Sequence, residues 1–115
     1  MTEAELQRDV IRFLDLALDQ PAVVIHVPNN PRNAIAGRNL KATGLRKGAP
    51  ALLVFAQGQA IAIELKKPGG RVQPEQAAML EALGGCGVST AVCRSVEDVE
   101  IALSNAGVRM RARAA

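Results

Sequence analysis

The triplet Glu64-Leu65-Lys66 carries the residue types in this sequence that are best suited to chemistry. It ends an apolar run typical of a β-strand, in which side chains i and i+2 share one face. Glu64 and Lys66 should therefore project together, while Leu65 points into the core. A carboxylate can bind a metal that activates water for attack on a phosphodiester, and an ammonium can orient that water. The alternative is a strand end where both side chains simply meet solvent.

A metal site of this kind needs a second carboxylate on the neighbouring strand, because hard divalent cations prefer several oxygen ligands. The expected place is the start of the preceding strand, immediately after Gly48-Ala49-Pro50. The position to inspect is therefore residue 51, which is an alanine.

Hydrophobic periodicity and turn residues predict the elements that must position these side chains. The order is α-β-β-β-α-β-α, which predicts an α/β fold with a mixed sheet flanked by helices. A long irregular stretch, 28–50, is either functional or disordered. The expected helices cover 3–19, 74–83 and 96–105, and the expected strands cover 22–27, 51–55, 60–66 and 88–93, with a hairpin through Gly58.

Length and composition indicate one domain over 1–108 with a basic C-terminal tail over 109–115. Of the 115 residues, 49% are hydrophobic and 22% are charged, which excludes global disorder. No apolar run is long enough for a membrane helix, and the acidic N-terminus does not resemble a signal peptide. We expect a soluble, cytoplasmic protein, either bacterial or, if phage-encoded, in the host cytoplasm.

Aromatic and sulfur-containing residues are few. Phe13 and Phe55 are the only aromatic residues, which argues against recognition of single strands by base stacking. The two cysteines, Cys86 and Cys93, match neither a disulfide framework nor a zinc pattern. We expect two reduced, buried thiols.

The net charge of +3 is unevenly distributed, since no acidic residue lies between Asp19 and Glu64. This pattern indicates either a phosphate-binding surface or a solvated basic loop with a frayed end. Charge alone leaves both interpretations open. The basic residues concerned are Arg32, Arg38, Lys41, Arg46 and Lys47 in the gap, and Arg109, Arg111 and Arg113 in the tail.

The ordered blocks of the chain resemble the VRR-NUC family, the virus-type replication–repair nucleases of the PD-(D/E)XK superfamily. The blocks are 47–54 (KGAPALLV), 61–66 (IAIELK), Gln76, 92–95 (VCRS) and 97–98 (ED). The resemblance spans Glu3 to Leu103. It implies a restriction-endonuclease-like fold and a Mg²⁺- or Mn²⁺-dependent DNA endonuclease that acts on structured or branched DNA such as Holliday junctions.

The resemblance also assigns roles to residues. An aspartate at position 51, Glu64 and the Leu65 carbonyl would hold the metal, Lys66 would position the attacking water, and the loop 28–50 would grip phosphates. This chain departs from the family at Ala51, where the family has the aspartate, so metal binding and catalysis should be impaired. Either the alanine was introduced to trap an inactive protein, which we favour, or the chain is naturally degenerate.

Other residues carry over more loosely. The family often has an acidic or amide residue in the first helix, and register favours Gln7 over Glu3, although an exposed polar residue is an alternative. Gln76 matches a family glutamine but could equally serve the helix start that Gln73 caps. Lys67 and Arg71 are candidate phosphate contacts that position DNA without reading its sequence.

His26 is the sole histidine, and a structural role is favoured over proton transfer. Asn29 and Asn30 are expected to shape a turn rather than bond the DNA backbone. Two cuts in a junction need two active sites, so we expect a symmetric homodimer. Two rival functions stay open: a non-catalytic DNA-binding module, favoured by Ala51, and a protein-interaction domain whose basic loop binds an acidic partner.

Overall fold

The computed structural model describes residues 1–28 and 47–114. The predicted order α-β-β-β-α-β-α is confirmed, and so is the mixed sheet. The predictions for Asn29, Asn30, Arg32, Arg38, Lys41 and Arg46 lie outside the described residues. The elements are α1 (Glu3–Ala17), β1 (Ala22–His26), β2 (Leu52–Ala56), β3 (Gln59–Leu65), α3 (Pro74–Gly85), β4 (Ser89–Cys93) and α4 (Val96–Asn105).

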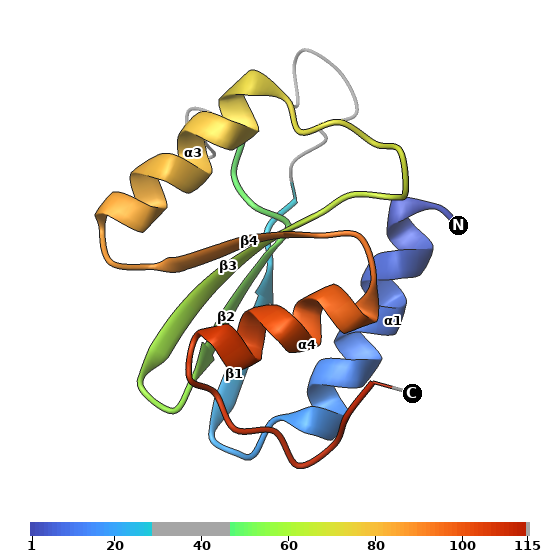
Figure 1. Cartoon of the computed structure of the whole chain (residues 1–115), viewed down its shortest axis with the longest axis vertical. Coiled ribbons are helices and arrows are strands. Elements are labelled where there is room, and N and C mark those ends of the chain that lie inside the picture. The colour runs from blue at the N-terminus through green and yellow to red at the C-terminus, as the bar shows by residue number, and fades with distance from the viewer. Residues whose placement is uncertain (29–46, 115) are drawn as a thin grey trace.

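The four strands form one sheet in the order β1-β2-β3-β4 (Figure 1). β1, β2 and β3 pair antiparallel, whereas β4 pairs parallel to β3. The parallel pairing is possible because α3 crosses from the end of β3 to the start of β4. α1 and α4 contact each other and the sheet, and α3 contacts β3 and β4.

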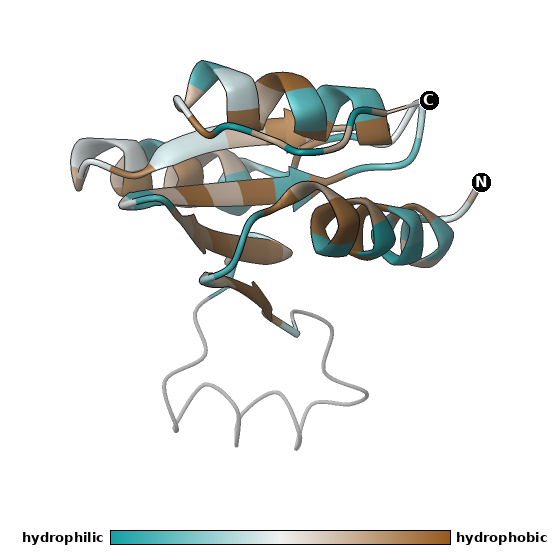
Figure 2. Cartoon of the chain, turned by 90° about the horizontal axis from the view of Figure 1, so that it is seen from below, coloured by the Kyte–Doolittle hydropathy of each residue, from teal (hydrophilic) through white to brown (hydrophobic). Residues whose placement is uncertain are grey.

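The helix α1 begins where the sequence predicts a capping box. The Thr2 hydroxyl accepts a hydrogen bond from the Glu5 amide at 3.1 Å, and the Glu5 carboxylate accepts one from the Thr2 amide at 3.2 Å. The helix ends at Ala17 rather than at 19, because Leu18 adopts an extended conformation. Figure 2 shows α1 divided between hydrophobic and hydrophilic residues, as expected for a helix that covers a sheet on one side.

The core is aliphatic, as the composition predicts. Ile61, Ile63 and Leu65 of β3 are each at most 2% exposed and pack against α1 and α4 side chains. Phe13 is the only aromatic side chain in this core among the described residues. None of the helices in residues 1–28 and 47–114 is long and apolar enough to cross a membrane.

The basic segment after α4 is anchored, so a frayed end does not describe residues 108–114. Val108 is buried, and the Arg111 amide donates a hydrogen bond to the Ala17 carbonyl at 2.9 Å. The Arg111 Nε donates to the Leu16 carbonyl at 2.9 Å, which places a cation at the C-terminus of α1, where the helix dipole favours it. The Ala114 amide donates to the Glu100 carboxylate at 2.7 Å.

The expectation of two buried thiols is wrong for one of them. Cys93 is 1% exposed, and burial raises the pKa of its thiol to about 12, with a smaller contribution from the Asp98 charge. Cys86 is exposed because it follows the last turn of α3, a helix in which no residue is fully buried. The sequence pattern predicts that Cys86 follows the helix, but it does not show that so little of α3 is buried.

Candidate active site

Glu64 and Lys66 lie at the C-terminal end of β3, in the centre of the sheet. Glu64 is 5% exposed and Lys66 is 7% exposed, so the interpretation of a strand end that meets solvent is wrong. The Lys66 amide donates to the Cys93 carbonyl at 3.0 Å, which extends the parallel pairing by one residue. Charged residues are rarely buried to this degree unless they have a partner, so this pair needs an explanation.

Ala51 lies opposite Glu64. The β2–β3 register pairs Leu52 with Ile63, and one step further along the antiparallel strands sets position 51 against position 64. Directly opposed residues of an antiparallel pair carry their Cβ atoms on one face, about 5 Å apart. The Val27 amide donates to the Ala51 carbonyl at 2.9 Å and holds this residue in line with β1. A side chain at position 51 therefore points toward the Glu64 carboxylate.

A cavity of about 270 Å³ forms at this end of the sheet. The catalytic, metal-binding and supporting residues inferred from the sequence all line it, although they come from separate elements. His26 and Gln73, for which structural roles were favoured, line it as well. The lining residues include Glu3 and Gln7 from α1, His26 and Val27 at the end of β1, Ala49 and Ala51 before β2, Glu64, Leu65 and Lys66, and Gln73 and Gln76.

The described basic residues that were expected to contact phosphates, Lys47, Lys67 and Arg71, lie outside the lining of the Glu64 cavity. Lys67 and Arg71 follow Lys66 and are exposed, and neither lines the cavity. Lys47 forms an ion pair with Glu75 at 3.5 Å in the first turn of α3. Its side chain is 83% exposed, so this pair is weak, and a phosphate could compete with Glu75 for it.

Gly48 brings the start of α3 close to residue 51. Its φ of +86° is a conformation that glycine adopts readily, and a Cβ atom there would collide with the Glu75 carbonyl. Gln73 and Gln76, on the same helix start, therefore lie at the cavity wall. The Gln73 amide donates to the Gln76 side chain at 2.8 Å, so Gln76 does serve the helix start.

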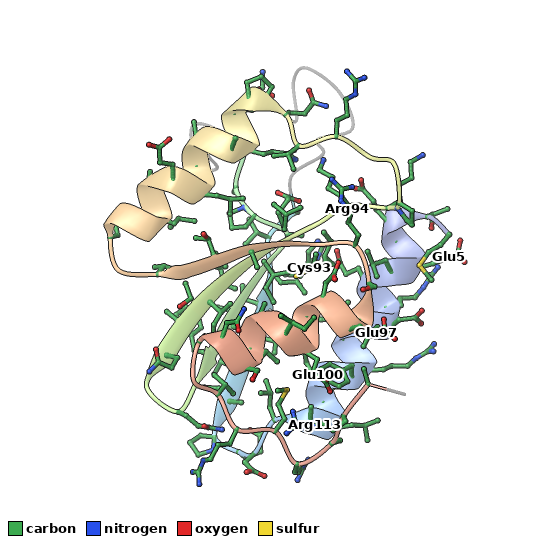
Figure 3. The ribbon with its side chains drawn as sticks, in the orientation of Figure 1. Glu5, Cys93, Arg94, Glu97, Glu100 and Arg113 are labelled. Atoms are coloured by element: carbon green, nitrogen blue, oxygen red, sulfur yellow. The ribbon has the colours of Figure 1, made fainter. Side chains whose placement is uncertain are left out.

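Arg94 fixes the turn that follows Lys66. Its guanidinium donates to the Gly70 carbonyl at 2.6 Å and to the Lys67 carbonyl at 3.2 Å. Its own amide donates to the Asp98 carboxylate at 2.9 Å, which joins the turn to α4. Figure 3 labels Arg94 where the chain leaves β4. Arg94 therefore holds the backbone of the turn immediately after Lys66.

The charge state of Glu64 reflects its burial. Desolvation raises the pKa of this carboxyl, and the negative charge of Glu3 raises it further, whereas the Lys66 ammonium and the Leu65 amide lower it. Its Oε2 atom is buried and has no hydrogen-bond partner within the described residues. The Lys66 charge and the Leu65 amide therefore offset only part of the cost of burying the ionised Glu64 carboxylate.

Glu64→Gln is expected to stabilise the fold near pH 7 by about 1 kcal/mol. Because the folded-state pKa is raised, stability falls as the pH rises through the range between the unfolded and folded pKa values. The amide has no such titration. The gain should therefore shrink toward zero at about pH 4, where the carboxyl is largely protonated in both states. Urea unfolding at both pH values in EDTA measures this, and an equal gain at both would contradict it.

The described residues around Glu64 do not form a complete site for a tightly bound divalent metal. The unpartnered Glu64 Oε2 is the kind of atom that a cation would satisfy. Position 51 offers only a methyl group, and within residues 1–28 and 47–114 no group of three or more His, Cys, Asp or Glu side chains could hold a metal. One carboxylate is in place, and the one expected opposite it is missing.

Comparison with known proteins supports the family expected from the sequence. The family model described as VRR-NUC domain matches residues 2–97. No curated protein is significantly similar in sequence. A solved structure described as a VRR_NUC domain protein aligns with a TM-score of 0.69 and 21% identity, covering 92% of this chain and 88% of the other.

A second solved structure, described as a VRR_NUC domain, aligns with a TM-score of 0.62 and 22% identity, covering 90% of this chain and 97% of the other. At these identities the structural likeness concerns the fold. The family model covers most of the chain, including every described residue that lines the cavity around Glu64. The chain therefore belongs to the VRR-NUC family, a family of metal-dependent nucleases.

Proposed function

We propose that the Glu64 cavity is a DNA phosphodiesterase centre whose activity is impaired in this chain by Ala51. The observation that carries this proposal is that Glu64 and Lys66, two charged residues that are both buried, share one cavity with position 51. A buried cation stabilises negative charge that develops on a phosphate far better than an exposed one does. A bound divalent metal would supply the activation of water, and the donor set present here holds it poorly.

The substrate class that we propose is branched DNA such as a Holliday junction. Family membership implies a nuclease, and the preference for branched DNA rests on the resemblance to small junction-resolving nucleases. The exposed cations near the cavity, Lys47, Lys67 and Arg71, suit phosphate contacts that position a duplex without reading bases.

Binding of fluorescent DNA tests this proposal without requiring catalysis. The protein, in EDTA, is titrated into a four-way junction and into a linear duplex of equal length at several salt concentrations. We expect tighter binding to the junction and affinity that falls steeply with salt, because phosphate contacts release counterions. Binding that is weak and insensitive to salt would overturn the proposal.

A second candidate function is a DNA-binding module without catalysis, and Ala51 is the observation that favours it. Both functions predict the same DNA binding. They differ after Asp is restored at position 51, since a module that has lost its chemistry elsewhere would bind junctions and never cut them.

Symmetric cleavage of a junction also needs two copies of the single cavity described here. We therefore expect a homodimer in solution, the commonest symmetric assembly. Sedimentation equilibrium at micromolar concentration should give a mass near twice the 12.1 kDa of the chain. A monomer that persists with junction DNA present would contradict the expectation.

A further inference from the structure

A second hollow, of about 650 Å³, runs beside α1 and shares three lining residues with the Glu64 cavity. The shared residues are Glu3, Gln7 and His26. Beyond them, the second hollow is lined by Arg8, Ile11 and Arg12 from the same helix. The two hollows therefore meet, and together they form one groove, which we call the α1 groove. It leads from the buried Glu64 along the helix.

The charges of the α1 groove suit a chain of phosphates. Arg8 and Arg12 are four residues apart, so their side chains lie on one face of α1 with a rise of about 6 Å between them. Both arginines are exposed. Two acidic residues line the groove: Glu64 inside the cavity, and Glu3 where the two hollows meet.

Arg12 also has an acidic neighbour outside the lining. Its Nη1 lies 3.6 Å from the Asp9 carboxylate, with side chains 76% and 42% exposed. An exposed pair of this kind contributes little, and a phosphate oxygen can replace the aspartate without much cost. Asp9 thus weakens the cationic character of the groove without abolishing it.

We propose that the α1 groove binds the DNA strand that continues from the cleavage site, with Arg8 and Arg12 each contacting a phosphate. The proposal rests on the proposed function, because it takes the Glu64 cavity as the place of the scissile phosphate. Continuity with that cavity favours a nucleic acid strand over an acidic protein segment, since a protein ligand would have no reason to reach Glu64. This proposal places DNA contacts on α1. The sequence did not indicate them, because its clustered basic residues lie between Asp19 and Glu64 and in the C-terminal segment.

The test compares two double variants that remove the same charge. Arg8→Gln/Arg12→Gln removes the two arginines of the groove and leaves Lys66 in place, and Arg109→Gln/Arg113→Gln removes two exposed arginines of the C-terminal segment. Figure 3 shows Arg113 below α4, near the C-terminus of the chain, whereas Arg94 lies where the chain leaves β4. Binding of a four-way junction is measured in EDTA for both variants and the parent, after thermal unfolding has confirmed that all three fold.

We expect the α1 variant to bind about tenfold more weakly at physiological salt and to lower the salt slope of log K by roughly two. The C-terminal variant should change both quantities much less. Equal losses of DNA affinity in the two variants, or an α1 variant that binds DNA like the parent, would overturn the proposal that the groove binds DNA. If the parent itself does not bind DNA, the proposed function fails instead, so the two failures are distinguishable.

Two further measurements locate the strand. Asp9→Asn should tighten binding a fewfold, because it frees Arg12 for phosphate. A photo-crosslinking residue, p-benzoylphenylalanine, placed at Ile11 should crosslink to junction DNA, whereas the same residue at Leu16, which is 67% exposed on α1 outside the groove, should not. Crosslinking from Leu16 alone would show that the strand takes another path.

Discussion

Replacing Ala51 with aspartate is expected to raise the rate of Mg²⁺-dependent junction cleavage by about a hundredfold or more. The register sets position 51 directly opposite Glu64, so an aspartate there would give the cavity two facing carboxylates. Two carboxylates, the Leu65 carbonyl and Gln7 would then offer Mg²⁺ the several oxygen ligands that it prefers. Gel assays of a labelled four-way junction, with and without EDTA, measure the gain.

Ala51→Asn is the matched control, because its side chain has nearly the shape of aspartate without the negative charge. It should gain far less activity than Ala51→Asp. If Asp and Asn raised cleavage equally, the effect would come from packing at the cavity wall and not from metal binding. If Ala51→Asp bound junctions but never cut them, the DNA-binding module would be the correct function.

Lys66→Met in the Ala51→Asp background is expected to lower the cleavage rate by about 10²- to 10³-fold. Lys66 is 7% exposed as a whole residue and lines the same cavity as Glu64, so water cannot readily take over the interaction of its charge with the reacting phosphate. The affinity for DNA should change little, because so buried a cation contributes little to the first encounter with the substrate. Single-turnover rates and separate binding titrations distinguish the two quantities.

Lys67→Met is the matched control for Lys66→Met. Lys67 is the next residue, carries the same charge and is exposed. Its loss should reduce affinity and salt dependence modestly and leave the single-turnover rate within about tenfold of the parent. Equal effects of the two substitutions on the rate would contradict a special role for the buried lysine.

The fold was predictable because short-range patterns set most of it. The Thr2–Glu5 capping box, the cap at Ser95 and the glycine turn at Gly58 all appear in the sequence and recur in the structure. The expected hairpin between β2 and β3 makes these strands antiparallel, so the start of β2 lies beside the end of β3. That arrangement is why the sequence could suggest that Glu64 and residue 51 lie close together.

The environment of the site was less predictable, because it depends on contacts between distant segments. Alternation along β3 gives the faces of Glu64 and Lys66 but cannot show that both faces are covered there, so solvent exposure was a fair alternative. His26 gave no signal beyond being the sole histidine. The register pairs His26 with Leu52, one residue along from Ala51, and the cavity that it shares with Ala51 forms where this end of the sheet meets Glu3 and Gln7 of α1.

The most direct measurement is anomalous diffraction from crystals of the Ala51→Asp variant soaked in Mn²⁺. The account predicts one strong anomalous peak between the Glu64 carboxylate and the side chain at position 51, within bonding distance of both, and a much weaker peak in crystals of the parent. A strong peak at another place in a variant that cuts DNA, or equal peaks at this place with alanine and aspartate, would contradict it.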